Sequence, residues 1–192
     1  MKKAVCGAIL AITLGAAIIG CTGSRNESNQ KKYDSLFLGI SLGMESKAFY
    51  DHCWEYNKKK IFTHGPTNQN VEYKLVDGNN SPVSMRFYPT FYKDKIFEMP
   101  VTFTYDAWAP WNRQYQSDTL LVNMLEVFKK WYGPDFKELD HYTMGKVYYK
   151  MDGKRRINLF IKDDQFVQAV FTDLKVEKEL KKLSAEQSTK AN

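Results

Sequence analysis

Apolar side chains recur with a helical period in the segment that follows Gly43. The residues that share one face, at positions i, i+3, i+4 and i+7, are Phe49, His52, Cys53 and Tyr56. Glu45 lies near the start of this segment and a run of lysines, 58–60, lies near its end, which suits the dipole of a helix. The pattern therefore predicts an amphipathic helix, preceded by a short buried strand or an extended entry segment at residues 36–40.

A second and clearer helical stripe follows Ser117. Its apolar members are Leu121, Met124, Leu125, Phe128 and Tyr132. Ser117 is a favourable N-cap, and Asp118 lies in the first turn, where a negative charge is stabilising. Gly133 followed by Pro134 ends the helix, because proline cannot continue it. A last helix, rich in Lys and Glu, is predicted for residues 174–187.

Strand-like segments fill the chain between these helices. The predicted strands cover residues 71–76, 83–88, 96–105, 145–151, 157–162 and 166–172. Turn residues separate them, at 77–80, 93–95, 152–153 and 163–164. Links this short force antiparallel pairing. The sequence thus predicts an α+β fold: an antiparallel sheet with helices packed on one face, two tandem helix-plus-β-meander units and a C-terminal helix.

The first residues of the chain carry a pattern of a different kind. Lys2 and Lys3 precede an uncharged, mainly apolar run that ends at Gly20, and Cys21 follows. This arrangement resembles a bacterial lipoprotein signal peptide. The resemblance implies that residues 1–20 are removed and that Cys21 carries the lipid, with acyl chains such as palmitate holding the protein on a membrane. A retained transmembrane helix is the alternative, although about 17 apolar residues is short for a span.

The lipoprotein resemblance also implies a location and a domain organisation. Thr22 follows the cysteine, where Asp would commonly signal retention in the inner membrane, so we expect an outer-membrane lipoprotein that faces the periplasm or the surface. Residues 21–33 are polar, lack apolar periodicity and are expected to form a flexible tether. A single α+β domain is predicted for residues 34–183, with a disordered tail at residues 184–192.

Composition narrows the classes of function. The chain has 192 residues and a net charge of +6 at pH 7. Loss of Lys2 and Lys3 with the signal would leave a charge of about +4, which suits a position beside anionic lipid. We expect no nucleic-acid binding, because the compartment is wrong and no recognition motif is present. Cys53 would remain as the only ordinary thiol, so no intramolecular disulfide is expected.

The sequence offers no set of residues that suits catalysis or a metal. His52 and Cys53 are adjacent on the predicted helix, so their side chains do not face each other, and no third group is indicated to orient them. His64 and His141 are isolated, without metal-ligand spacing. We therefore expect no catalytic residues, no metal and no cofactor. The basic run 154–156 is interpreted as a solvated strand edge, with contact to anionic lipid or to a partner as the alternative.

Aromatic residues are concentrated in one part of the chain. Ten of the 28 Phe, Tyr and Trp residues lie between positions 87 and 115, most of them on predicted strands. The segment 106–115 has neither a helical nor a strand period and contains Pro110. Its candidate ligand- or partner-binding residues are Trp108, Trp111, Arg113 and Tyr115. An exposed loop of this kind suits anchoring a partner or stacking on a sugar; the alternative is a connection that folds back over the open end of the core.

Two short motifs resemble a known group of domains. They are Gly39-Ile40-Ser41-Leu42-Gly43-Met44 ahead of the first helix and Trp131-Tyr132-Gly133-Pro134 at the end of the second. They are similar to motifs of small extracytoplasmic domains, the β-lactamase-inhibitor-protein-like group and the SmpA/OmlA lipoprotein domain. That resemblance implies a binding or assembly-support role and assigns no functional residues.

Taken together, the patterns predict a membrane-anchored extracytoplasmic lipoprotein that is not an enzyme and that binds another protein of the cell envelope. The alternative is a glycan- or small-ligand-binding module that uses the aromatic segment 106–115.

Overall fold

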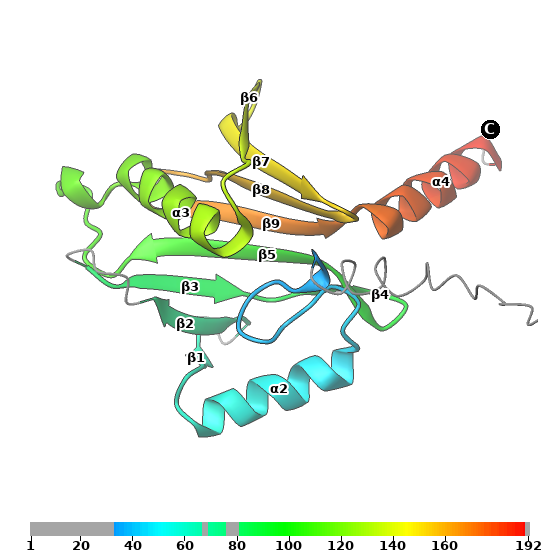
Figure 1. The fold of residues 1–192 in the computed structure, drawn as a ribbon, viewed down its shortest axis with the longest axis horizontal. Helices are drawn as coiled ribbons and strands as arrows, with labels where there is room; N and C mark the ends of the chain where they lie inside the picture. Colours follow the sequence, from blue (N-terminus) through cyan, green and yellow to red (C-terminus); the bar gives the residue numbers. More distant parts are fainter. Residues whose placement is uncertain (1–32, 67–68, 76–80, 191–192) are drawn as a thin grey trace, which may run out of the picture.

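The computed structural model describes residues 33–66, 69–75 and 81–190. The predicted signal peptide, Cys21, the predicted tether as far as residue 32 and the predicted turn at 77–80 lie outside the described residues. Within the described part, one antiparallel sheet of nine strands runs through the molecule and three α-helices accompany it (Figure 1). The predicted α+β class is confirmed.

The helices are α2 (Ser46–Lys58), α3 (Ser117–Tyr132) and α4 (Leu174–Lys190), with a short 3₁₀ turn η1 (Arg113–Tyr115). The strands are β1 (Thr63–His64), β2 (Val71–Leu75), β3 (Val83–Phe87), β4 (Thr90–Tyr92), β5 (Lys95–Tyr105), β6 (Lys137–His141), β7 (Gly145–Asp152), β8 (Arg155–Ile161) and β9 (Val167–Asp173).

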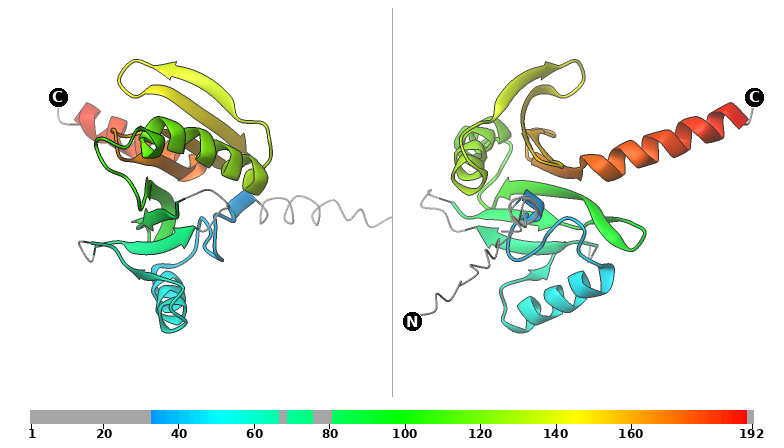
Figure 2. Two further views of the ribbon diagram at one scale, coloured as in Figure 1. Left: turned by 90° about the vertical axis from the view of Figure 1, so that its left-hand side faces the viewer. Right: turned by 45° about the vertical axis from the view of Figure 1, so that its right-hand side comes forward.

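The strand order shows how the two predicted units are joined. It runs β1-β2-β3-β5-β9-β8-β7-β6, with β4 paired to β5 outside this path. β5 and β9, the last strands of the two units, pair antiparallel at the centre, where Val101 lies opposite Ala169. The two helix-plus-meander units therefore lie side by side in one continuous sheet. Figure 2 shows that the β6–β7 hairpin curls over α3.

The core lies between this sheet and the helices on one of its faces. Phe128 of α3 contacts the ring of Phe103 in β5 at 5.8 Å and that of Phe171 in β9 at 5.9 Å. Tyr56 of α2 contacts the ring of Phe62 at 4.8 Å, and Phe62 contacts Phe87 of β3 at 5.5 Å. Because Phe87 and Phe103 point the same way by strand alternation and register, both helices pack on the same face. This confirms the predicted packing.

Residues 36–40 form a tight loop and not the predicted strand or extended segment. The amide of Leu36 donates to the carbonyl oxygen of Ile40, and the amide of Ile40 donates to that of Phe37, each at 2.9 Å. Gly39 has φ +81°, a conformation that glycine adopts without strain. The apolar residues at 36, 37 and 40 are buried. The run is therefore core material, as its composition indicates, but the chain reverses here.

The start of α3 differs from the prediction. The N-cap is Gln116, whose side chain makes no capping hydrogen bond, and Ser117 is already the first helical residue. The amide of Ser117 donates to the carbonyl oxygen of Asp164 at 3.1 Å, and its side chain is buried. Packing against the β8–β9 turn thus replaces the predicted cap. At the other end, Gly133 follows the helix with φ +95° and donates to Lys129, as the Gly-Pro signal indicates.

The last helix, α4, follows β9 directly and projects from the body of the molecule (Figure 2). Its base is fixed by Glu177, which pairs with Arg156 at 2.9 Å, and by Glu179, which pairs with Lys93 at 2.7 Å. Residues 181–188 are exposed. The helix continues to Lys190, through residues for which the sequence predicts a disordered tail. Across the described ranges, no helix combines the length and the hydropathy needed to cross a membrane.

Candidate functional sites

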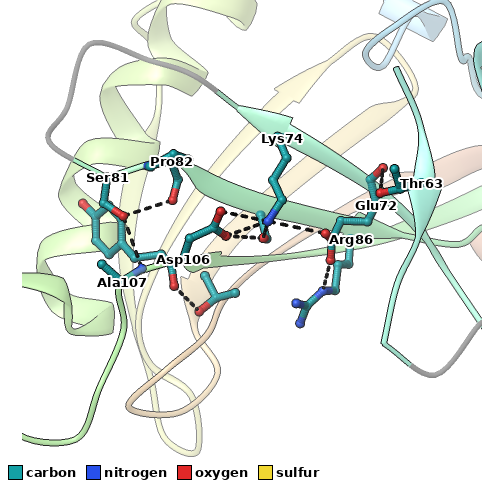
Figure 3. Close-up of polar contacts among 11 residues, drawn as sticks. Thr63, Glu72, Lys74, Ser81, Pro82, Arg86, Asp106 and Ala107 are labelled. Carbon is teal, nitrogen blue, oxygen red and sulfur yellow. Dashed lines mark hydrogen bonds and ion pairs between the residues drawn. The ribbon is translucent and has the colours of Figure 1, made fainter. Parts of the chain in front are cut away.

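The face of the sheet opposite the core carries a polar network at the end formed by β2, β3 and β5. Lys74 lies at its centre: its Nζ donates to both carboxylate oxygens of Asp106 at 2.8 Å and to the hydroxyl of Ser84 at 2.6 Å. Beside it, Nε of Arg86 donates to Glu72 at 2.7 Å. Figure 3 shows Lys74 and Asp106 pointing toward each other, with the Glu72–Arg86 pair next to them.

The neighbouring charges and hydrogen bonds of this network keep the Asp106 carboxyl ionised. Burial by itself would raise the pKa of the Asp106 carboxyl, but hydrogen bonds from Lys74 and Ser84 outweigh burial and hold that pKa below its ordinary value. Nζ of Lys74 donates hydrogen bonds to Ser84 and to Asp106, so it is not placed as a base that would activate the Ser84 hydroxyl. Ser84 is also only 1% exposed. The three residue types that meet here are arranged to hold the end of the sheet, not to attack a substrate.

The loop 106–115 leaves the sheet at this network and is held by hydrogen bonds along its length. The side-chain amide of Gln116 donates to three carbonyl oxygens of the loop, those of Ala109 (3.1 Å), Pro110 (3.4 Å) and Asn112 (3.4 Å). The amide of Asn112 donates back to Ala109 at 2.9 Å. The loop is consequently a defined structure with its own internal bonds.

The structure divides the four candidate residues of this loop into two pairs. Trp108 and Tyr115 are half-buried and pack against the core; the ring of Tyr115 meets that of Tyr105 at 5.2 Å. Trp111 is 85% exposed. Arg113 is exposed too and forms no ion pair with any residue that the structure describes. Binding by the four residues stays a prediction, in which Trp111 and Arg113 are the members that face solvent.

A second candidate site lies at the C-terminal end of α3 and is not indicated by the sequence. It is a pocket of about 350 Å³, and its principal lining residues are Trp131, Tyr132, Asp135, Lys150, Asp152 and Arg155. Two of these are buried cations, since Lys150 is 7% and Arg155 is 4% exposed. A buried charge is stable only with partners, so the contacts of these two side chains decide what the pocket can do.

Arg155 is held through both terminal nitrogens of its guanidinium, while its buried Nε has no hydrogen-bond partner among the described residues. Its Nη2 donates to Asp152 at 2.9 Å, its Nη1 donates to the carbonyl oxygen of Ser35 at 2.5 Å, and its guanidinium lies 4.9 Å from the ring of Tyr132. Burial raises the pKa of Tyr132, so its hydroxyl stays protonated and donates to the backbone of residue 36. Lys150 is held less closely: its Nζ lies 3.4 Å from a carboxylate oxygen of Asp135 and 3.4 Å from one of Asp152.

These contacts correct the interpretation of the basic run 154–156. Arg155 is buried on the core face, Lys154 pairs with Asp173 at 2.9 Å, and Arg156 pairs with Glu177. None of these three side chains is simply solvated at the edge of a strand. The signal for Arg155 was its spacing: it precedes Ile157 by two residues, and alternate residues of a strand share a face. Asp152, which lies next to the turn, also forms an ion pair with Arg155.

His52 and Cys53 have separate surroundings on α2. Nε2 of His52 lies 2.8 Å from the carbonyl oxygen of Leu38, and its ring lies 4.2 Å from that of Tyr56. Cys53 is half-buried, and burial raises the pKa of its thiol to about 11. The protonated thiol is unreactive. His52 and Cys53 therefore do not act together as a base and a nucleophile.

Among the residues that the structure describes, no three His, Cys, Asp or Glu side chains converge on a position suited to a metal ion. Comparisons with models of protein families, with curated proteins and with solved structures give no match to this chain.

Proposed function

We propose that this protein is a membrane-anchored extracytoplasmic binding module and that it docks onto another protein of the cell envelope through Trp111. One observation carries the proposal: Trp111 is 85% exposed, on a loop whose backbone is fixed from both sides. Tryptophan is among the residues that dominate binding energy at protein interfaces.

The fixed loop supports this assignment. Binding costs free energy when a flexible segment must be ordered, and a segment that is already ordered avoids that cost. Gln116 holds the carbonyl groups on both sides of Trp111, and Trp108 ties the loop to the rest of the domain. The loop therefore presents one indole in one orientation, as an anchor residue requires.

The neighbouring charges indicate the chemistry of the partner. The Arg113 guanidinium lies two residues from Trp111 and is exposed. Lys74 is already neutralised by Asp106, so it contributes polarity and not a free charge. We expect the partner to offer an apolar pocket for the indole, bordered by a carboxylate that pairs with Arg113.

Photo-crosslinking tests the docking. A photoreactive phenylalanine derivative at position 111 is expected to give one covalent adduct in intact membranes, and the adduct is expected to weaken with Arg113→Glu. The same derivative at Val122, a residue of α3 that is 62% exposed, is the matched control and is expected to give none. Recovery of monomer alone at position 111, or equal adducts at both positions, would contradict the proposal.

Membrane anchoring is proposed from the sequence pattern of residues 1–21. Acyl chains at Cys21 would give a durable attachment, because each buried methylene contributes about 0.8 kcal/mol. A Cys21→Ala variant is expected to leave the membrane fraction and to lose labelling by radioactive palmitate, whereas Cys53→Ala is expected to behave as the unaltered chain. Retention of Cys21→Ala on membranes would contradict the anchor and leave the role of Trp111 to its own test.

An exposed indole also suits stacking on a sugar ring, so glycan binding at the same loop is the second candidate function. The exposure of Trp111 favours it, whereas Trp108 is half-buried against the core. Fluorescence titration with oligosaccharides distinguishes the two: a saturable change that is absent from Trp111→Ala would favour the glycan, and its absence together with a specific adduct would favour the protein partner.

A further inference from the structure

The pocket at the end of α3 combines an aromatic wall with a charged floor. We propose that it binds a neutral saccharide unit that stacks on Trp131 and forms hydrogen bonds with Lys150 and Asp135. This site is separate from the loop that carries Trp111, and the proposal does not depend on docking of that loop.

The wall is the indole of Trp131. Trp131 is 43% exposed, so a substantial part of its ring faces solvent. Its ring stacks on Phe128 with a centroid distance of 6.0 Å and an interplanar angle of 27°, and it meets Tyr132 edge-on at 6.1 Å. These two rings support one side of the indole and leave part of it open to the pocket. A flat, apolar surface is what the apolar face of a sugar ring requires.

The floor offers a cation with unused capacity. The Lys150 ammonium has three N–H donors, and its two carboxylate partners each lie at 3.4 Å, beyond the usual length of a good hydrogen bond. At 7% exposure it has little water to make up the difference. A ligand hydroxyl at ordinary distance would therefore improve the surroundings of this ammonium.

The balance of charge selects a neutral ligand. Two cations, Lys150 and Arg155, face two carboxylates, Asp135 and Asp152, around the pocket. A phosphate or carboxylate close to Lys150 would also lie close to both carboxylates and be repelled by them. A hydroxyl group can accept from the ammonium and donate to a carboxylate, so a polyol satisfies both. The volume of about 350 Å³ is at the lower end for small-ligand pockets, which fits one or two sugar rings.

Asp135 is the acceptor best placed to respond to a ligand. Its side chain is 84% exposed, and among the described residues its one ion pair is the long contact with Lys150. It can move to meet a hydroxyl without disturbing the fold. Asp152 is held by Arg155 and keeps the floor in place.

Isothermal titration calorimetry of the full chain tests the proposal, with glucose, galactose, mannose, N-acetylglucosamine and their disaccharides as probes. We expect saturable binding of at least one of them, abolished by Trp131→Ala. Asp135→Ala is expected to weaken it about tenfold, the value of a hydrogen bond to a charged group, and to leave folding intact. Trp54→Ala, which removes a tryptophan of α2 that is 62% exposed, is the matched control and is expected to bind as the unaltered chain.

Four outcomes would overturn the proposal. Binding lost in Trp111→Ala and kept in Trp131→Ala would place the sugar on the loop. Unchanged binding in Asp135→Ala would contradict the hydrogen bond proposed between the ligand and Asp135, without relying on the more disruptive tryptophan variant. Binding of inorganic phosphate in preference to every saccharide, or no saccharide binding at all, would rule out a neutral sugar as the ligand.

Discussion

The indole N–H of Trp108 donates to the backbone carbonyl oxygen of Asp164 at 3.3 Å. This bond joins the loop that closes the first helix-plus-meander unit to the β8–β9 turn of the second. The amide of Ser117 donates to the same carbonyl at 3.1 Å, on the other side of the loop. The position of the exposed Trp111 is therefore determined by contacts with both units, although its own side chain faces solvent.

Two tryptophans that are three residues apart are expected to differ sharply in their effect on stability. Trp108→Ala removes a ring packed against the core and is expected to lower the free energy of unfolding by about 2 kcal/mol. Trp111→Ala removes an exposed ring and is expected to change it by less than about 0.5 kcal/mol. Urea denaturation followed by circular dichroism measures both. If Trp111→Ala destabilised the protein as much as Trp108→Ala, the side chain of Trp111 would itself be holding the loop in place, contrary to this account.

The second prediction concerns the contact that joins the two units. The ring of Phe128 is fully buried and meets Phe103 of the first unit and Phe171 of the second. Phe128→Ala is expected to cost about 3–5 kcal/mol, because it leaves a cavity at the seam of the sheet. Val122→Ala, on the exposed face of the same helix, is the control and is expected to cost less than about 0.5 kcal/mol. Similar midpoints for the two variants in thermal unfolding would contradict this account of the core.

Much of the architecture follows from local patterns in the sequence. Alternation along residues 96–105 and the turn at 152–153 predict strands and a hairpin that the structure contains. The prediction of a strand or extended segment at residues 36–40 is wrong, because a short apolar run indicates burial and does not show how the backbone turns. β6 has no apolar alternation, and its place depends on pairing with β7, where Leu139 lies opposite Val147. Such a strand is set by its neighbour and cannot be found from its own residues.

The pocket at the end of α3 was hidden for a different reason. Its charges come from parts of the chain that only the complete fold brings together: Arg155 bonds the backbone of Ser35, 120 residues away, and Lys150 meets Asp135 across a hairpin. Sequence spacing predicts which face of a strand Arg155 occupies, but it contains nothing about which acid lies opposite. The place of Trp111 in a loop, in contrast, follows from Pro110 and the lack of any period, whereas the sequence leaves open whether the loop exposes the indole or folds back over the core.

The third prediction concerns pH. The pKa of Asp106 is lower in the folded protein than its ordinary value, which an unfolded chain would show, so ionised Asp106 stabilises the fold. That contribution is complete above the ordinary pKa, near pH 4, and is lost as pH falls through the lower folded value. The difference in unfolding free energy between the unaltered chain and Asp106→Asn is thus expected to shrink from pH 5 toward pH 3, as measured by urea denaturation.

Lys74 supplies the control for this effect. In a Lys74→Met background the strongest partner of Asp106 is gone, so Asp106→Asn is expected to change stability by nearly the same amount at both ends of that pH range. A pH dependence that survives in Lys74→Met would show that another charge, such as Arg86, holds the carboxylate ionised.

The last prediction concerns the thiol of Cys53, whose surroundings keep it protonated. Burial raises its pKa to about 11, so at pH 8 the fraction present as thiolate is roughly 100-fold smaller than for a small-molecule thiol. We expect alkylation by iodoacetamide, followed by mass spectrometry of the peptide that contains Cys53, to be slower than alkylation of a free thiol by at least that factor. Unfolding in guanidinium chloride removes the burial and is expected to restore the ordinary rate. A native rate equal to the unfolded rate would mean that α2 opens readily, and that the aromatic contacts of Phe49 and Tyr56 do not hold this helix closed.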